Sequence, residues 1–284
     1  MALYVNPKLS DRDYGLFRIG GPGLANCMFV AARAAILARK LGAVMLRPTW
    51  ERFGVGQWIR RERDKRFYSG LFKGGVLGNG FNKLCLKLTQ RHILEEAADS
   101  AKKGVIEVRG LRNYFADLLH DADAVRQYFT DNIRPQAISK VPSGKQDAVG
   151  IHIRLGDFPA EYRTDINWYV NVVKALIAHE KYGYKQRFWL FSDGLDCELK
   201  PLLDIPNVER VCFGNALADI VAISRCRLLI GSDSTFSGWG AFLGDIPCVF
   251  AHIHYGRILE DCNKVLISND EKEIASWLSQ KEIN

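Results

Sequence analysis

The sequence predicts an α/β fold built from parallel sheets with helices on both faces. The first observation is that short apolar runs alternate with helical periodicity along the second half of the chain. The second is that three of these runs end in polar loops, which read RLGD, SDG and GSDS. The third is a glycine loop, GGPG, between a short apolar run and a helical segment in the first half. Together they indicate α/β units with a ligand site at the strand ends.

The second half of the chain contains the more regular pattern. Its first expected strand, 148–154, places Val149, Ile151 and Ile153 on one face and His152 and Arg154 on the other. The other expected strands are 188–191, 211–213, 228–230 and 248–251, and the expected helices are 165–181, 217–225 and 235–243. Since ligands bind beyond the carboxyl ends of parallel strands, the polar loops are expected to converge on one ligand.

The first half contains one expected βαβ unit with the glycine loop at its first turn. Its strands are 16–19 and 44–46, its helix is 24–41, and Gly42 is the expected helix stop. Asn26 stands where a dinucleotide fingerprint would have its third glycine. The loop therefore gives only a weak indication of a dinucleotide site.

A linker is expected between the two halves. A further strand at 105–108 and a helix at 117–129 precede the polar segment 131–147, which contains two prolines. Composition of this kind is typical of domain boundaries. We therefore expect two domains, 1–140 and 148–284.

The charge balance of the 284-residue chain favours polyanionic partners. The formal net charge is +7 and the sequence pI is about 9.0, which suits nucleotide phosphates, nucleic acid or an acidic membrane surface. No nucleic-acid-binding motif is present, so we expect no nucleic-acid partner. The basic run 59–66 has interleaved acidic residues and is expected to be a solvated face. A patch for anionic lipid or an acidic acceptor is the alternative.

The hydropathy pattern indicates a cytoplasmic chain, and the cysteine spacing indicates reduced thiols. No apolar run approaches the roughly 18 residues of a membrane span, and the first residues contain no hydrophobic signal-peptide core. We expect a cytoplasmic protein, or one whose targeting segment was removed, with peripheral contact at the inner face of the membrane as an option. The seven cysteines form no CxxC pair and are expected to be buried, reduced thiols.

The loop that contains Ser234 and Thr235 is the first candidate ligand site. It leads from an expected strand into an expected helix, whose N-terminus would offer N–H groups and a positive dipole end to a phosphate. The alternative is that these residues only cap the helix. Arg154, at the end of another strand, could bind the same phosphate through two parallel hydrogen bonds, or could form a salt bridge with Asp157.

Three further polar residues lie at expected strand ends. His152 shares a strand face with Arg154 and is expected to be a buried, hydrogen-bonded histidine rather than a catalyst. Asp193, which follows Ser192, and Asp233 could each read a guanine, since one carboxylate accepts from both N1–H and N2–H₂. The alternative for each carboxylate is that it caps the next helix.

Two Asp-x-Asp pairs are candidates for a metal site. They are Asp11 with Asp13 and Asp121 with Asp123, and neither follows a convincing strand. Turn and helix-start roles are the favoured interpretation. We therefore expect no metal site.

Four short motifs, spread from residue 20 to residue 241, occur in an order that matches one family. GIHIRLGD (150–157) is similar to H-x-R-R-x-D, and FSD (191–193) is similar to F-S-D-D. IGSDSTFSGWGA (230–241) is similar to I-S-N-S-S-F-S-W-W-A/G-A, and GGPGLANCMF (20–29) to G-G-L-G-N-Q-M-F. The chain thus resembles the α-1,2-fucosyltransferases and the related α-1,6- and protein O-fucosyltransferases.

The resemblance implies a GT-B-like architecture, with two Rossmann-like domains facing a cleft. It implies an inverting, metal-independent transfer of fucose from the donor substrate GDP-fucose, without a further cofactor, to a hydroxyl of a glycan or glycolipid acceptor, with α-1,2 linkage expected. The N-terminal domain, 1–140, would be the acceptor side, and the C-terminal domain, 148–284, would bind the GDP-sugar. A fixed arginine and a helix N-terminus can stabilise the charge on leaving GDP without a metal.

The resemblance also implies roles for particular residues. Arg154 would bind the β-phosphate, and the start of the helix at 234–236 would hold phosphate and nucleoside. The glycine-loop residues would face the sugar or the acceptor. The expected donor-binding residues are His152, Arg154, Ser192, Asp193, Asp233, Ser234, Thr235, Phe236, Gly21, Gly23 and Asn26.

The base that takes the acceptor proton is less clearly indicated. Glu161 and Asp157 are the candidates that join Arg154 in the expected catalytic set, with Asp13 as a third option and with an Arg154-orienting role as the alternative for Asp157. Aromatic residues between 50 and 90 could stack on acceptor sugars, although core packing is the default. They are Trp50, Phe53, Trp58, Phe67 and Tyr68.

Three positions depart from the family motifs. Leu155 replaces the second arginine, Asp233 replaces an asparagine, and Gly238 replaces one tryptophan. Asp233 would repel a phosphate, so it is expected to point at the base or ribose. These departures keep two alternatives open: a transferase for another GDP-sugar, and a non-catalytic protein of the same fold that binds nucleotides or polyanions.

Overall fold

The structure is a computed structural model, and it describes residues 2–54, 67–73, 76–156, 158–178 and 185–280. The chain divides into two compact units, Met1–Ala137 and Ile138–Asn284, called unit 1 and unit 2 below. The division falls within the polar segment 131–147. Each unit combines a parallel sheet with helices.

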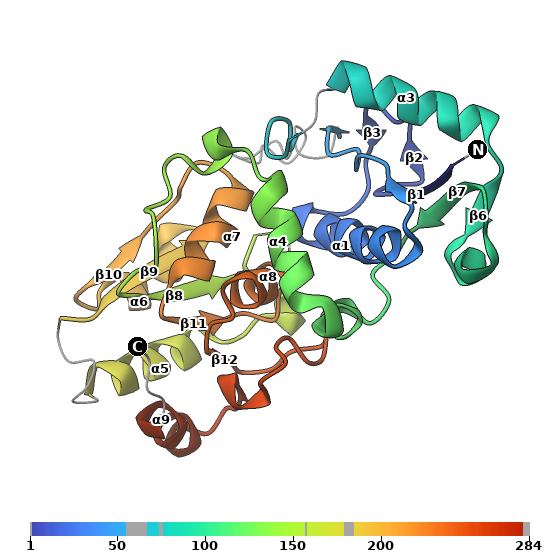
Figure 1. Cartoon of the computed structure of the whole chain (residues 1–284). Coiled ribbons are helices and arrows are strands. Elements are labelled where there is room, and N and C mark those ends of the chain that lie inside the picture. Colours follow the sequence, from blue (N-terminus) through green and yellow to red (C-terminus); the bar gives the residue numbers. More distant parts are fainter. Residues whose placement is uncertain (1, 55–66, 74–75, 157, 179–184, 281–284) are drawn as a thin grey trace. The chain divides into compact units, whose positions relative to one another are not determined.

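Unit 2 is built on a six-stranded sheet in which every neighbouring pair of strands is parallel (Figure 1). In spatial order the strands are β10 (Val208–Arg210), β9 (Arg187–Ser192), β8 (Ala148–Ile153), β11 (Leu228–Gly231), β12 (Cys248–Phe250) and β13 (Val265–Ile267). Because the strands are parallel, the carboxyl ends of β9, β8, β11 and β12 lie side by side. The loops that follow these four strands are therefore neighbours.

Helices cover both faces of this sheet. They are α5 (Ile166–Ala178), α6 (Asp196–Leu203), α7 (Ala216–Arg225), α8 (Thr235–Gly244) and α9 (Glu271–Gln280). On one face, Val149, Ile151 and Ile153 of β8 enter a core cluster with residues of α5, α6 and α9. On the other face, Gly150 lies against Cys226, which follows α7, and His152 contacts α8. All of β8 is therefore buried, as a strand covered on both faces requires.

Helices α7 and α8 approach closely because two positions of α8 have no side chain. A Cβ atom on Gly240 would lie 2.3 Å from Cγ2 of Ile223 in α7. A Cβ atom on Gly244 would lie 2.1 Å from the backbone oxygen of Ser224. Both distances are shorter than a van der Waals contact, so the glycines set the helix spacing. This packing holds α8, and with it the loop that leads into α8.

Replacing Gly240 with alanine is expected to lower the free energy of unfolding by about 1–3 kcal/mol, the usual cost of overpacking. Ile223→Ala removes the Cγ2 methyl group that the new Cβ would meet at 2.3 Å and keeps only the Cβ of residue 223, at 2.9 Å. The added cost of Gly240→Ala should therefore shrink in that background. Urea unfolding of the wild type, both single variants and the double variant measures this difference. Equal costs in the two backgrounds would show that the Cγ2 methyl group of Ile223 does not limit the approach of the helices.

Unit 1 contains a four-stranded parallel sheet and a small three-stranded sheet. The first has the order β4 (Val44–Met45), β1 (Leu3–Pro7), β7 (Gly104–Val108) and β6 (His92–Leu94), and the second has β2 (Arg12–Asp13), β3 (Arg18–Ile19) and β5 (Arg52–Phe53). The helices are α1 (Leu24–Leu41), α3 (Val76–Thr89) and α4 (Ala122–Asn132). Helix α1 packs on β1, β4 and β7, and α4 packs on α1.

Short 3₁₀ helices occur in both units. They are Glu95–Ser100, Tyr114–Asp117, Leu119–Asp121, Pro135–Ile138, Ala160–Tyr162 and Cys262–Lys264. Two of them occupy the start of the helix predicted at 117–129. For that reason α4 begins only at Ala122.

The βαβ unit predicted in the first half is wrong in one strand. Helix α1 and its stop at Gly42, which has a left-handed φ of 59°, are confirmed. However, β4 pairs in parallel with β1, where Tyr4 lies opposite Val44, and not with residues 16–19. Residues 18 and 19 belong instead to β3 of the small sheet. The run LYVNP of β1 is too short and too polar at its end to predict a strand.

One strand of unit 2 and four of the seven cysteines also differ from the prediction. The strand predicted at 211–213 lies at Val208–Arg210, because this edge strand has exposed residues and little apolar signal. Cys212 is consequently exposed. Cys85, Cys197 and Cys262 are exposed as well, whereas Cys27, Cys226 and Cys248 are buried as predicted. All seven cysteines are free thiols.

Among the described helices, none combines the length and the apolar character that a membrane crossing requires.

Candidate functional site

Asp193 joins the loops that follow β8 and β9. Its carboxylate forms an ion pair with Arg154, and both side chains are partly exposed. Oδ1 of Asp193 also accepts from the backbone N–H groups of Leu155, at 2.8 Å, and Gly156, at 3.2 Å. The carboxylate therefore fixes the backbone of one loop and the guanidinium that this loop carries.

The two loops also fit together sterically. A Cβ atom on Gly156 would lie 2.5 Å from Oδ2 of Asp193, and a Cβ atom on Gly194 would lie 2.5 Å from Cδ1 of Leu155. Ser192 supports the turn, since its Oγ accepts from the backbone N–H of Gly194 at 3.0 Å. The loops after β8 and β9 thus form one interlocked structure.

The first turn of α8 is capped by Ser234, whose Oγ accepts from the backbone N–H of Phe236 at 3.3 Å. His152 of β8 lies behind this turn, with Nδ1 2.6 Å from Oγ of Ser237 and its ring stacked on Phe236 at 4.7 Å. Burial lowers the pKa of His152 well below its ordinary value of 6.5, so the ring is neutral. Thr235, the first residue of α8, is half-buried. His152 therefore supports the start of α8 from inside the unit.

Asp233 pairs with a histidine that follows β12. Its side chain is only 7% exposed, and Oδ1 lies 2.7 Å from Nδ1 of His254. The same oxygen accepts from the backbone N–H of His254 at 3.0 Å. Oδ2 lies 3.9 Å from Nε2 of His252. The buried carboxylate is thus covered by this loop.

His252 and His254 were not predicted from the sequence. The signal was present, because the sequence H-I-H directly follows the strand predicted at 248–251. Polar residues at that position are expected at the ligand edge of a parallel sheet. The link from His254 to Asp233, 21 residues earlier, required the strand order.

In unit 1 the glycine loop is shaped by Arg18, which is fully buried. Its Nη1 donates to the backbone oxygen of Gly20 at 2.6 Å. Gly21 has a φ of +81°, and a Cβ atom there would lie 2.8 Å from Nη1 of Arg18. Only glycine fits this position without strain.

The loop leads directly into α1. Gly23 is the N-cap residue of α1, and the hydroxyl of Tyr68 accepts from the backbone N–H of Leu24 at 3.1 Å. Asn26 is half-buried in the first turn of α1. Gly21, Gly23 and Asn26 thus lie together at the start of this helix, as the glycine-loop motif predicts.

The candidate bases differ in their exposure to solvent and in the unit to which they belong. Glu161 is exposed in a 3₁₀ helix of unit 2. Asp157 lies outside the described residues, as does the basic run 59–66. Asp13 is buried in unit 1 and serves an ion pair there. Of these candidates, Glu161 is the carboxylate that the structure places at a surface.

Asp13 and Lys83 of α3 form a fully buried ion pair, with Oδ2 and Nζ 3.2 Å apart. Nζ also donates to Oγ1 of Thr49, at 2.8 Å, and to the backbone oxygen of Arg47, at 3.1 Å. Burial lowers the pKa of Lys83 from 10.5 to about 8. Burial also opposes ionisation of Asp13, but Lys83 and the backbone N–H of Gly15 hold its pKa below 3.8. The pair anchors α3 to the small sheet.

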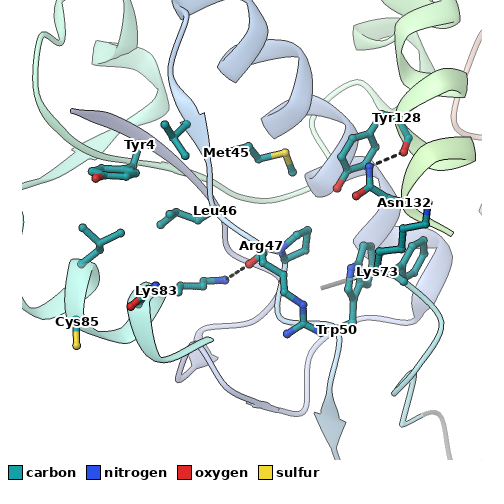
Figure 2. A pocket seen from close by; sticks show the side chains of 15 residues that line it. Tyr4, Met45, Leu46, Arg47, Trp50, Lys73, Lys83, Cys85, Tyr128 and Asn132 are labelled. Atoms are coloured by element: carbon teal, nitrogen blue, oxygen red, sulfur yellow. Dashed lines mark hydrogen bonds between the residues drawn. The ribbon is translucent and has the colours of Figure 1, made fainter. Parts of the chain in front are cut away.

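A cavity of about 700 Å³ opens beside β4 in unit 1 (Figure 2). Trp50 stacks on Phe72 at 4.1 Å and forms an apolar part of its wall. The guanidinium of Arg47, which also lines it, pairs with Glu51 and has no hydrogen-bond partner at Nε and Nη1 among the described residues. The remaining lining residues are Tyr4, Val44, Met45, Leu46, Pro48, Lys73, Asn82, Lys83, Cys85, Leu86, Tyr128 and Asn132.

The aromatic residues predicted between 50 and 90 divide into two groups. Trp50 and Tyr68 are buried, which agrees with core packing. Phe53 and Phe67 are exposed and contact each other edge to face at 6.1 Å. Trp58 lies outside the described residues.

The model of glycosyl transferase family 11 matches residues 108–250, about half of the chain. No curated protein matches the chain. Among the solved structures similar to it is a variant of FUT1 from Arabidopsis thaliana in complex with GDP. The identity is 13%, over 89% of this chain and 71% of that chain, with a TM-score of 0.52.

Two other solved structures are similar at lower TM-scores. The NodZ alpha-1,6-fucosyltransferase soaked with GDP-fucose, a protein also solved from Bradyrhizobium, has 14% identity over 86% of this chain and 92% of that chain, with a TM-score of 0.49. The E. coli heptosyltransferase WaaC with ADP has 10% identity over 99% and 98%, with a TM-score of 0.44. The fold of FUT1 and the parallel sheets confirm the predicted α/β, GT-B-like class. The family match confirms the predicted family resemblance.

Proposed function

From the premise that the chain belongs to glycosyl transferase family 11 and is a glycosyltransferase, we propose that it transfers fucose from GDP-fucose to a glycan hydroxyl. The observation that carries the proposal is the position of Arg154 at the carboxyl end of β8. Strand β8 lies beside β11 in the sheet, and the loop after β11 leads into the N-terminus of α8. FUT1, whose fold this chain shares, was solved with GDP. The motif resemblance supports fucose as the sugar and α-1,2 as the linkage.

The reaction that we propose is an inverting displacement. The acceptor oxygen forms a bond to the anomeric carbon as the bond from that carbon to the β-phosphate oxygen breaks. The electron pair of the broken bond leaves with GDP. Arg154 and the N-terminus of α8 stabilise the negative charge that develops on the leaving GDP. Both are preorganised groups, so no metal ion is required.

The acceptor hydroxyl must also lose its proton, and we propose Glu161 as the base. Three of the expected donor-binding residues act indirectly in this proposal. Ser192, Asp193 and His152 hold the loops in place through the contacts described above. We place the acceptor in unit 1, where the glycine loop and the cavity beside β4 offer polar and aromatic groups.

A transferase for another GDP-sugar is the second candidate. Two observations favour it, namely Leu155 in place of an arginine and the pairing of Asp233 with His254. Both change the side chains of the loops that the family motifs would use to bind the donor. The donor sugar is therefore decided by the experiment below.

Calorimetric binding of GDP, GDP-fucose, GDP-mannose and UDP, all with EDTA present, tests the proposal. We expect GDP and GDP-fucose to bind while UDP gives no signal, because the nucleotide is recognised as a guanine diphosphate. A preference for GDP-mannose over GDP-fucose would support the second candidate. If no nucleotide binds, with or without Mg²⁺, both transferase proposals for a GDP-sugar fail.

A further inference from the structure

Arg210 holds the loop that follows β9 from the neighbouring edge strand. It is the last residue of β10, where it lies opposite Leu190 of β9. Its Nη2 donates to the backbone oxygen of Ser192 at 3.1 Å and to that of Gly194 at 2.8 Å. These two oxygens belong to the residues on either side of Asp193. One guanidinium nitrogen therefore restrains the backbone before and after that carboxylate.

The other terminal nitrogen of the same guanidinium is fixed by α6. Nη1 of Arg210 forms an ion pair with Asp196, the first residue of that helix. An arginine stays protonated and its donors keep fixed directions in one plane, so the ion pair also sets the direction of Nη2. The side chain of Arg210 is 34% exposed and that of Asp196 is 76% exposed. Because exposed ion pairs contribute little to stability, this pair orients the loop more than it stabilises the fold.

The loop that Arg210 restrains carries the carboxylate that orients Arg154. Asp193 pairs with Arg154 and accepts from the backbone N–H groups of Leu155 and Gly156, as described above. The strands β10, β9 and β8 are consecutive in the unit 2 sheet (Figure 1). A continuous line of polar contacts therefore runs along the carboxyl edge of the sheet, from Arg210 through Asp193 to Arg154.

The position of the Arg154 guanidinium depends on this line of contacts. A donor stabilises a developing charge only if it already stands in the right place, and a displacement of about 1 Å is enough to lower a rate strongly. Without Arg210, the backbone on both sides of Asp193 would lose the guanidinium that holds it. The bonds from Asp193 to Leu155 and Gly156 would remain, so the loss of Arg210 should displace Arg154 only in part.

We propose that Arg210 is a positioning residue for Arg154, acting through the loop 192–194 and the carboxylate of Asp193. This proposal rests on the proposed function, since it assumes that Arg154 binds the diphosphate of the donor. Arg210 itself does not contact the donor. The edge strand β10 thereby contributes to donor binding, although none of the four family motifs includes one of its residues.

A double-mutant cycle in GDP binding tests whether Arg210 acts through Arg154. We expect Arg154→Ala to bind GDP about 10- to 100-fold more weakly than the wild type, the usual effect of losing a charge-assisted hydrogen bond. Arg210→Ala should bind GDP about 3- to 10-fold more weakly, because Arg154 is present but less well held. In the Arg154→Ala background the same substitution should change GDP affinity by less than about twofold, since no guanidinium remains to be positioned.

A conservative variant and a matched control complete the experiment. Arg210→Lys should lie between Arg210→Ala and the wild type, because an ammonium can donate to the same backbone oxygens but lacks the planar fork that also reaches Asp196. The control is Arg225→Ala, since Nη1 of Arg225 also donates to backbone oxygens, at 3.4 Å to Val141 and at 2.6 Å to Pro142. Arg225 ends α7 just before β11, at the amino-terminal edge of the sheet, so its loss should leave GDP affinity unchanged. Calorimetry with GDP up to millimolar concentrations measures affinity, and urea unfolding confirms that each variant is folded.

The outcomes distinguish the two proposals. If Arg154→Ala weakens GDP binding but Arg210→Ala does not, the positioning role of Arg210 is refuted and the proposed function stands. The same conclusion follows if Arg210→Ala costs an equal factor in both backgrounds, or if Arg225→Ala weakens GDP binding as much. If the wild type binds no GDP, or if Arg154→Ala binds it as well as the wild type does, the proposed role of Arg154 fails and this inference fails with it. An effect of Arg210→Ala that is confined to proteins with Arg154 supports the inference.

Discussion

Replacing Arg154 with alanine is expected to lower kcat for transfer from GDP-fucose by about 100- to 1000-fold, the usual loss for one preorganised donor at a developing anion. Arg154 stands at the end of β8 in a partly exposed ion pair with Asp193, so its loss should leave the fold intact. Arg154→Lys should recover only part of the rate, because an ammonium lacks the planar fork that binds phosphate through two hydrogen bonds. Steady-state kinetics and urea unfolding measure both effects.

The matched control for this prediction is Arg227→Ala. Arg227 immediately precedes β11 and pairs with Asp147, 2.7 Å away, at the amino-terminal edge of the same sheet. That edge is opposite the proposed donor site, so transfer should stay within about twofold of the wild type. A similar loss of kcat in Arg154→Ala and Arg227→Ala would mean that Arg154 acts through the fold and not through the phosphate.

Replacing Lys83 with methionine is expected to destabilise the protein by about 3–5 kcal/mol, because it leaves Asp13 as an unpaired charge in the interior. Both side chains of this pair are almost completely buried. The control is Lys40→Met, since Lys40 faces Asp99 across 3.9 Å with both side chains exposed. An exposed pair of this kind contributes about 0–1 kcal/mol. Urea unfolding of the two variants measures the difference.

A double variant tests the reason for the Lys83 effect. In Asp13→Asn with Lys83→Met, the side-chain oxygen of Asn can still accept from Gly15 and Thr49, and neither position of the former pair carries a charge. The double variant should therefore be more stable than Lys83→Met alone. If it is less stable than Lys83→Met, the cost comes from lost packing of Lys83 and not from the stranded carboxylate.

The sheet of unit 2 could be predicted from the sequence because its central strands are buried on both faces. β8, β9 and β11 appear as apolar runs with clear ends, and each ends in a polar loop. The edge strand β10 has too few apolar residues to be located correctly. In unit 1, β4 has only two residues and β1 five, so their pairing depends on the tertiary structure.

The candidate site could be predicted only where its residues stand in local sequence motifs. Arg154, Ser234 and the glycine loop stand in motifs whose neighbours in the chain identify them. The partners of these residues are distant in the chain, such as Asp193 for Arg154 and His254 for Asp233. Sequence periodicity carries no information on such pairs, because they depend on the order of strands in the sheet.

The interlocked loops after β8 and β9 have a consequence for redesign of the protein. A side chain cannot be added at Gly156 without displacing Asp193, nor at Gly194 without displacing Leu155. A mutant library that randomises one loop alone would therefore return mostly variants in which the other loop is damaged. If the donor binds as proposed, a change of donor specificity needs both loops transplanted together from one parent enzyme, as a single cassette.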